Sequence, residues 1–285
     1  PNYGSIHLTD QARVDTQFDQ VFHDGKVNER FDYADGGYLL HGDYTKQDIE
    51  QAEKLLSDNG YTNSGKSQFV LLGHYVTDDG RVVTDMTADE AAQLPEFLLD
   101  NVTVHADDGQ LLKNMKASHL DVGSQNDVYI HNGASVFLAS QSSGKVITND
   151  SGNLPNVHVG VTGADESDAT GNLMVGDWYY GKDTAYQFGD VSISSGSSVI
   201  LNPGQYTFSN IENDGKMEIN LGYTSNEKAK IKTHLTVPQI HVSGDQADVS
   251  MMDTVLTGHV NVENCGRFYA SDSQVVGDVS VGYKG

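Results

Sequence analysis

Short segments of alternating apolar residues recur at a nearly constant interval toward the end of this chain. Ile240-His241-Val242, Val260-Asn261-Val262 and Val279-Ser280-Val281 begin successive units that are 20 and then 19 residues apart. A unit of this length is too small to bury its own apolar side chains, so neighbouring units must stack to share one core. The spacing therefore predicts a solenoid whose coils lie about 4.8 Å apart.

Other segments repeat the same pattern. Residues 128–138 match residues 191–201 at both alternating apolar pairs and at the glycine between them. Asp253-Thr254 and Asp272-Ser273 occupy the same place in adjacent units, 19 residues apart. Each unit also has a glycine where a side chain would clash at a corner of the coil, namely Gly258 and Gly277.

This periodicity changes near residue 101 and divides the chain into two regions. Residues 101–285 have almost no helical pattern and predict an all-β fold, a right-handed parallel β-solenoid. The handedness follows because parallel crossovers are right-handed in roughly 98% of cases. Residues 1–100 are expected to form a small α/β region that packs on the solenoid and covers its first strand edge.

Two helices are predicted in this N-terminal region. Apolar residues at positions 49, 52, 55 and 56 recur at helical spacing, with Thr45 as N-cap and Gly60 as a stop. A second helix is predicted over residues 87–99, where Thr87 and Glu90 have the capping-box spacing. Pro95 weakens this second prediction because a proline inside a helix removes a hydrogen bond.

The charge of the chain limits its partners. Its 285 residues include 40 Asp and Glu against 17 Lys and Arg, a formal net charge of −23. Such a surface repels nucleic acid at neutral pH and anionic lipid, and no apolar run approaches the roughly 18 residues of a spanning helix. The single cysteine, Cys265, excludes an internal disulfide framework. We expect an exported monomer that has neither a nucleic-acid nor a membrane partner.

A basic patch is one candidate binding site, since an acidic chain needs one to hold an anionic ligand. Arginine occurs at four positions, and one of them, Arg267, lies in the repeat region. The preceding unit is interrupted by residues 222–232, which contain Tyr223, Lys228, Lys230 and Lys232. These cations are suited to a carboxylate or sulfate, although pairing with surrounding carboxylates explains them equally well.

An aromatic segment is the second candidate. Residues 178–183 contain the single tryptophan, Trp178, together with Tyr179, Tyr180 and Lys182. Aromatic faces pack against the C–H faces of sugars, and tyrosine hydroxyls bond sugar hydroxyls. Core packing is the stronger interpretation for Trp178 but not for both tyrosines.

Catalytic and metal sites are not indicated by any local motif. The chain has no EF-hand, no Asp-rich nonapeptide repeat and no local Ser/His/Asp or Cys/His signature. Carboxylates that could bind calcium are numerous, but their spacing isolates no set: Asp121, Asp127, Asp150, Asp165, Glu166 and Asp168. We therefore predict no catalytic residue, no metal site and no cofactor.

Histidine is the expected pH-sensitive element. The chain contains 11 histidines, and several fall within or beside predicted strands: His131, His158, His234, His241 and His259. Their protonation between about pH 7 and pH 5 would reduce the negative charge by up to roughly half. For any single histidine, an ordinary outward position is the more conservative interpretation.

The helical N-terminal cap, the parallel solenoid, the acidic surface and the grouping of Tyr223, Lys228, Lys230 and Arg267 together resemble the ligand-binding region of serine-rich repeat adhesins from gut lactobacilli. The resemblance covers essentially the whole chain and depends on architecture and composition more than on one motif. It implies a pectate-lyase-like fold, display on a Gram-positive cell wall, and pH-affected binding of host mucosal glycoproteins or acidic polysaccharides.

Two other functions are also compatible with the sequence. One is a polysaccharide lyase or hydrolase that acts on a pectin-like substrate, because carboxylates on one parallel sheet could hold calcium. The other is a structural stalk module, which would bind no glycan.

Overall fold

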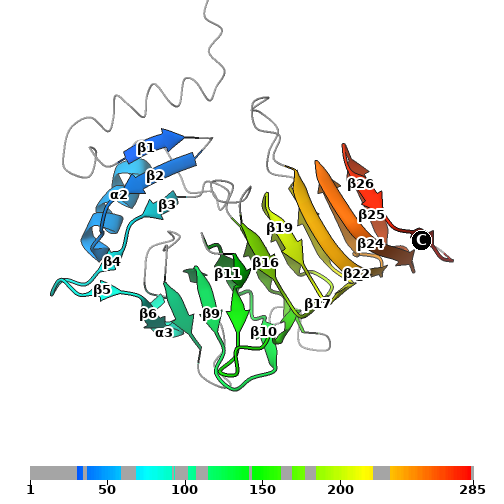
Figure 1. Cartoon of the computed structure of the whole chain (residues 1–285), viewed down its shortest axis with the longest axis horizontal. Helices are drawn as coiled ribbons and strands as arrows, with labels where there is room; N and C mark the ends of the chain where they lie inside the picture. Colours follow the sequence, from blue (N-terminus) through cyan, green and yellow to red (C-terminus); the bar gives the residue numbers. More distant parts are fainter. Residues whose placement is uncertain are drawn as a thin grey trace, which may run out of the picture.

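The computed structural model describes residues 31–34, 37–58, 69–91, 93, 102–106, 115–140, 143–161, 169–176, 184–220 and 232–283. Most of them form strands of parallel sheets that stack in register along one axis (Figure 1). Figure 1 places the N-terminal elements at one end of the molecule and the last strands at the other. The predicted fold, a parallel β-solenoid with a small α/β region before it, is confirmed.

The described residues of the N-terminal region include two small sheets. Strand β1 (Phe31–Ala34) is antiparallel to β2 (Gly37–His41), and β2 is parallel to β3 (Phe69–Leu72). Strands β4 (Tyr75–Val76) and β5 (Val82–Val83) form an antiparallel pair.

Helix α2 (Lys46–Asp58) begins where the sequence predicts. The Thr45 hydroxyl accepts a hydrogen bond from the Asp48 backbone N–H at 3.2 Å, and an Asp48 carboxylate oxygen accepts one from the Thr45 N–H at 3.0 Å. These reciprocal bonds satisfy donors that the first helical turn leaves unpaired. Ile49 and Ala52 are buried on one side of the helix.

The second predicted helix is present but short among the described residues. Helix α3 covers Ala88–Ala91, and Gln93 lies in a turn. The predicted capping box is confirmed, because the Thr87 N–H donates to Glu90 Oε2 at 2.8 Å and the Glu90 N–H donates to the Thr87 hydroxyl at 3.2 Å. Residues 94–99 of the predicted helix, Pro95 included, lie outside the described residues.

The solenoid has three faces, named here in the order in which a coil visits them. Face 1 contains the first halves of the long strands β22 (Thr233–Ser243) and β24 (Thr254–Glu263), together with β12 (Gly144–Lys145), β16 (Ala185–Gln187), β19 (Gln205–Thr207) and β26 (Gln274–Val276). Face 2 contains the second halves of β22 and β24, together with β10 (Asp127–Ile130), β14 (Asn156–Val159), β17 (Asp190–Ile193), β20 (Asn210–Asn213) and β27 (Val279–Val281).

Face 3 is a separate parallel sheet of seven strands: β8 (Met115–Ala117), β11 (Ser135–Leu138), β15 (Asn172–Val175), β18 (Ser198–Leu201), β21 (Lys216–Ile219), β23 (Asp248–Met252) and β25 (Arg267–Ser271). Before the regular coils, a four-stranded parallel sheet, the N-terminal sheet, contains β6 (Asp85–Thr87), β7 (Thr103–His105), β9 (His119–Asp121) and β13 (Ile147–Thr148).

The predicted repeat matches the register of the strands. Ile240 pairs with Val260, and Val260 pairs with Val279, so the three predicted units are consecutive coils. The segments 128–138 and 191–201 both run from face 2 to face 3, two coils apart, through Val157. The predicted equivalence of Thr254 and Ser273 is seen directly, because the Thr254 N–H donates to the Ser273 hydroxyl at 3.0 Å.

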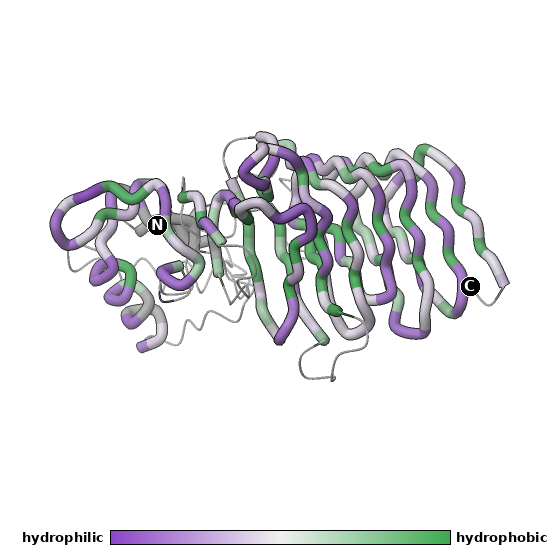
Figure 2. The backbone as a smooth tube through the Cα atoms, turned by 90° about the horizontal axis from the view of Figure 1, so that it is seen from below, coloured by the Kyte–Doolittle hydropathy of each residue, from purple (hydrophilic) through white to green (hydrophobic). Residues whose placement is uncertain are grey.

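Alternation of side chains builds the core. Along each coil, hydrophilic and hydrophobic residues alternate, as Figure 2 shows by colour. On face 2, the inward residues form one buried row from coil to coil: Val128, Val157, Val191, Ile211, Ile240 and Val260. Full burial of one such side chain contributes roughly 1.5–3 kcal/mol, which a single coil cannot obtain alone.

Two glycines allow the chain to turn from face 1 to face 2, one inside the long strand β24 and one between β26 and β27. Gly258 has a φ of 149° and Gly277 a φ of 150°. A Cβ added to Gly258 would lie 1.7 Å from the Val237 carbonyl oxygen, and one added to Gly277 would lie 1.9 Å from the Gly258 carbonyl oxygen. The predicted role of both residues at a coil corner is therefore confirmed.

Candidate binding surface

The outward side of face 2 is a polar surface made of rows that run from coil to coil. One row joins residues that are in register from strand to strand: Tyr129, His158, Ser192, Glu212, His241, Asn261 and Ser280. A second row lies two residues earlier on the same strands: Asp127, Asn156, Asp190, Asn210, Gln239 and His259. None of the described strands of face 2 contains a lysine or an arginine.

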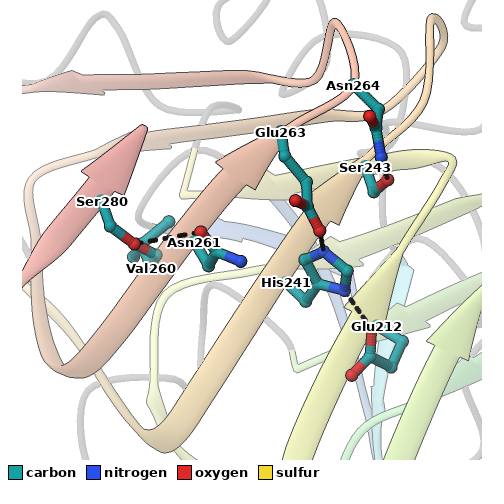
Figure 3. A network of polar contacts seen from close by, with 8 residues as sticks. All are labelled: Glu212, His241, Ser243, Val260, Asn261, Glu263, Asn264 and Ser280. Atoms are coloured by element: carbon teal, nitrogen blue, oxygen red, sulfur yellow. Dashed lines mark hydrogen bonds and ion pairs between the residues drawn. The ribbon is translucent and has the colours of Figure 1, made fainter. Parts of the chain in front are cut away.

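Toward the C-terminal coils, His241 lies between two glutamates from the coils on either side (Figure 3). Its Nδ1 is 2.8 Å from Glu212 Oε2, and its Nε2 makes a short contact with Glu263 Oε1. Burial lowers the pKa of His241, but the hydrogen bonds and charges of both glutamates outweigh burial, so the net pKa is raised. The ring therefore holds a proton at higher pH than a free histidine.

Neighbouring residues extend this network across the last coils. The Asn264 amide donates to the Ser243 hydroxyl at 3.0 Å, and the Ser280 hydroxyl donates to Asn261 Oδ1 at 3.0 Å (Figure 3). Close to His241, burial raises the pKa of Asp214, and the charge of Glu212 adds to this effect while His241 opposes it. Acid titration of this part of the surface thus involves coupled groups rather than isolated ones.

At the opposite end of face 2, His158 links three strands. Its Nε2 is 3.2 Å from Asp127 Oδ1, and its Nδ1 is 2.7 Å from the Ser192 hydroxyl. The Tyr129 ring stacks on the His158 ring, with centroids 4.7 Å apart and an interplanar angle of 17°. The Asn156 amide donates to Asp127 Oδ1 at 2.9 Å, and hydrogen bonds from Asn156 and His158 lower the pKa of Asp127.

The N-terminal sheet repeats the arrangement seen at His241. His105 Nε2 is 3.1 Å from Asp85 Oδ1, and His105 Nδ1 is 3.3 Å from Asp121 Oδ2. The hydrogen bond with Asp85 raises the pKa of His105, with further contributions from Asp121, against a smaller opposing effect of burial. In both places a histidine contacts carboxylates from the preceding and the following strand.

Two of the predicted ligand-binding residues lie among the described residues. Arg267 begins β25, is largely exposed and has its Nε 3.5 Å from Asp248 Oδ2. Lys232 directly precedes β22. The N–H of Thr233, the first residue of β22, donates to the carbonyl of Asp253, which directly follows the face 3 strand β23. The backbones of Lys232 and Arg267 are thus separated along the strand direction by roughly the length of β25, about 13 Å.

The other predicted ligand-binding residues cannot be placed in this way. Lys182 and the neighbouring tyrosines, together with the remaining members of the basic patch, lie outside the described residues: Tyr179, Tyr180, Lys182, Tyr223, Lys228 and Lys230. In sequence, residues 177–183 fall between β15 and β16, and residues 221–231 between β21 and β22. Both segments follow a face 3 strand and precede a face 1 strand.

Sequence reasoning identified the histidines of this surface but missed their partners. His158, His241 and His259 were singled out from the sequence, and each contacts a carboxylate of another coil; for His259 this is Asp278, at 3.3 Å. Glu212, Glu263 and Tyr129 were not selected. Tyr129 and Glu212 are in register with a histidine of the adjacent coil, and Glu263 lies two residues after the residue in register with His241, so the pairing of the strands is needed to find these contacts.

The surface belongs to a parallel β-solenoid with a histidine- and carboxylate-rich outer face. Comparison with known proteins found no matching family model, no matching curated protein and no matching solved structure. Within the described ranges, no group of three or more His, Cys, Asp or Glu side chains has the arrangement to hold a metal ion. The helices in the same ranges are all too short or too polar to cross a membrane.

Proposed function

We propose that this chain is the binding region of a cell-surface adhesin from a Gram-positive bacterium, and that it holds host mucosal glycoproteins or acidic polysaccharides without transforming them. The proposal is based on the groups that line the outer surface of face 2. This surface presents amide, hydroxyl, imidazole and carboxylate groups in two rows that run from coil to coil.

The spacing of these rows supports a polysaccharide ligand. Strands of a sheet lie about 4.8 Å apart, so each row offers a polar group at this interval. This interval is close to the length of one sugar unit in an extended chain. A regular polymer could therefore meet similar hydrogen-bonding groups at successive units, which gives affinity through many weak contacts.

Acidic pH should favour an anionic ligand, because the surface loses negative charge as it titrates. His241 becomes protonated at higher pH than a free histidine, since Glu212 and Glu263 stabilise its charged form. Carboxylates with ordinary pKa values near 4 follow at lower pH. Both changes reduce repulsion of a uronate or sulfate, while a sulfated ligand keeps its own charge.

The test measures binding of chondroitin sulfate and of a neutral galactan at about pH 7.4 and about pH 4.5, at fixed ionic strength. Circular dichroism at both pH values controls for loss of the fold. We expect affinity for chondroitin sulfate to rise on acidification and that for galactan to change much less. Absence of saturable binding to either polymer would favour the stalk function instead.

A second measurement addresses the lyase or hydrolase alternative. The protein is incubated with polygalacturonate and calcium, and unsaturated product and reducing ends are followed over time. We expect neither to accumulate above a heat-treated control. Steady formation of either product would replace the adhesin proposal by an enzymatic one.

A further inference from the structure

The exposed aromatic pair on face 2 suggests a site for one defined part of a glycan. Tyr129 is 47% exposed, although it lies in a regular strand and stacks on His158. The other aromatic ring contacts among the described residues, two stacked and one tilted, involve the buried rings of Tyr186, Tyr206, Phe188 and Phe208. Tyr129 therefore offers a ring surface to solvent where the rest of the outer face is polar.

The position of Tyr129 leaves its ring accessible from one side. Strand β10 is the terminal strand of face 2 in the described sheet, with β14 as its neighbour. His158, on β14, covers one side of the Tyr129 ring and is itself held by contacts with Asp127 and Ser192. The tyrosine is thus oriented before any ligand arrives, which reduces the entropy lost on binding.

Hydrogen-bonding groups surround this ring and define what it can accept. Asp127 lies two residues before Tyr129 on the same side of β10, and its side chain is 48% exposed. An ionised carboxylate is an acceptor only, so it suits a ligand that donates hydroxyl groups. The bonds from Asn156 and His158 lower the pKa of Asp127, so this carboxylate stays ionised over the pH range proposed for binding.

The charge of the surroundings argues against an acidic sugar at this point. The described strands of face 2 contain no Lys or Arg, whereas Asp127 and Asp190 lie in the same outward row. No Lys or Arg of the described face 2 strands would compensate a uronate placed on Tyr129, and the cation that His158 becomes on protonation lies 3.2 Å from Asp127 Oδ1 and offsets that carboxylate. A neutral ring has no such penalty, and its C–H face can pack on the tyrosine.

We propose that Tyr129, His158 and Asp127 form a subsite for a neutral hexose unit, with the sugar ring on Tyr129 and its hydroxyls donating to Asp127. This inference rests on the proposed glycan-binding function and deepens it. Acidic groups of a mixed polysaccharide would then lie elsewhere on the molecule, and the ligand would be recognised at this subsite through its uncharged units.

The test compares two tyrosines of similar exposure. Tyr129→Ala removes the ring of the subsite, and Tyr269→Ala removes a 60% exposed tyrosine on β25 of face 3. Neutral galactan and neutral glucan serve as probes. For whichever of them binds the parent, we expect Tyr129→Ala to lower the affinity by about fivefold to tenfold. Tyr269→Ala should leave this affinity within about twofold of the parent.

A second variant tests whether the negative charge of Asp127 favours a neutral or an anionic sugar unit. Asp127→Asn should weaken binding of the neutral polymer several-fold, whereas Asp190→Asn, in the same row two coils away, should have a smaller effect. If Asp127→Asn instead strengthens binding of chondroitin sulfate and leaves the neutral polymer unaffected, the site accepts an anionic unit and the inference is wrong.

The outcomes separate this inference from the proposed function. Binding of chondroitin sulfate without binding of either neutral polymer would overturn the subsite and leave the adhesin function standing. Neutral-polymer binding that is equal in the parent and in Tyr129→Ala would also overturn it. Circular dichroism and thermal unfolding of each variant show whether a loss of binding comes from unfolding, and Tyr129→Phe, which keeps the ring, should retain most of the affinity.

Discussion

The inner and outer sides of face 2 come from alternate residues of the same strands, yet they differ in how much the residue type varies from coil to coil. The inner row repeats one chemistry, with Val or Ile in register through six coils. The outer row changes at each coil, from tyrosine to histidine, serine, glutamate, histidine, asparagine and serine. The interior must be filled at constant volume, whereas solvent accepts any polar group. Recognition can therefore vary on the outside without cost to the fold.

The strongest test of this difference compares an inner residue with an outer one. Ile240→Ala should lower the free energy of unfolding by about 2–5 kcal/mol, because Ile240 is fully buried between Ile211 and Val260. Asn261→Ala, on the outer side of the next coil, should change it by less than about 0.5 kcal/mol. Urea titration followed by circular dichroism measures both. Similar losses for the two variants would show that the outer row also holds the coils together.

Asn213 is the polar exception among the buried inward residues of the described face 2 strands, and it sharpens the comparison. It lies between Ile193 and Val242 and is 1% exposed. Its amide donates to the Asp248 carbonyl at 3.0 Å, and its Oδ1 accepts from the Gly215 N–H at 3.2 Å. These bonds satisfy backbone groups where the chain turns from face 2 to face 3.

We expect Asn213→Val to destabilise the protein by about 1–3 kcal/mol, although valine restores the apolar row, because one buried and one partly buried backbone group lose their partners. Asn213→Asp keeps the acceptor for the Gly215 N–H but puts a carboxylate oxygen where the amide donates to the Asp248 carbonyl, so it should destabilise the protein as well. An Asn213→Val variant as stable as the parent would mean that apolar filling alone governs the inner side.

Apart from that of Asn261→Ala, the smallest expected change in the free energy of unfolding is that caused by His241→Gln, and it depends on pH. Glu212 and Glu263 raise its pKa in the folded state above the unfolded value, about 6.5. The folded state thus binds the proton more tightly, so this stabilisation is fully present below about pH 6.5 and is lost as pH rises through the folded pKa. His241→Gln should therefore cost under about 1 kcal/mol near pH 5.5, and less near pH 8.5.

Urea titration of the parent and of His241→Gln at both pH values measures this difference. A control replaces both glutamates by glutamine, which should remove the pH-dependent part of the effect of His241→Gln. A cost that is larger at pH 8.5 than at pH 5.5 would contradict the direction of the pKa shift.

Much of the fold could be predicted from the sequence because alternation and repeat length are local properties. Three kinds of feature could be predicted from the sequence alone: the unit spacing at Ile240, Val260 and Val279, the corner glycines, and the N-cap at Thr45. Each of them constrains residues that are close in sequence or separated by one coil. The second helix is predicted over residues 87–99, and its described part is a single turn at Ala88–Ala91.

The binding surface was predictable only in part. Selecting residues by charge and rarity led to Arg267, which the structure shows in contact with Asp248. It did not lead to Tyr129 or to the glutamates beside His241. These residues look like ordinary outward positions in sequence, because nothing in a single strand shows which side chain will stand beside them in the next coil.

By itself, the sequence determined that the coils stack, since an apolar residue at every second position in units of about 20 residues can be buried in no other way. Tertiary structure alone decided which polar groups meet. Coils are lengthened by segments such as residues 221–231, so Glu212 and His241 are 29 residues apart in the chain while His241 and Glu263 are 22 apart. The ladder of backbone hydrogen bonds sets the register despite these unequal lengths, and it thereby brings both glutamates to one histidine.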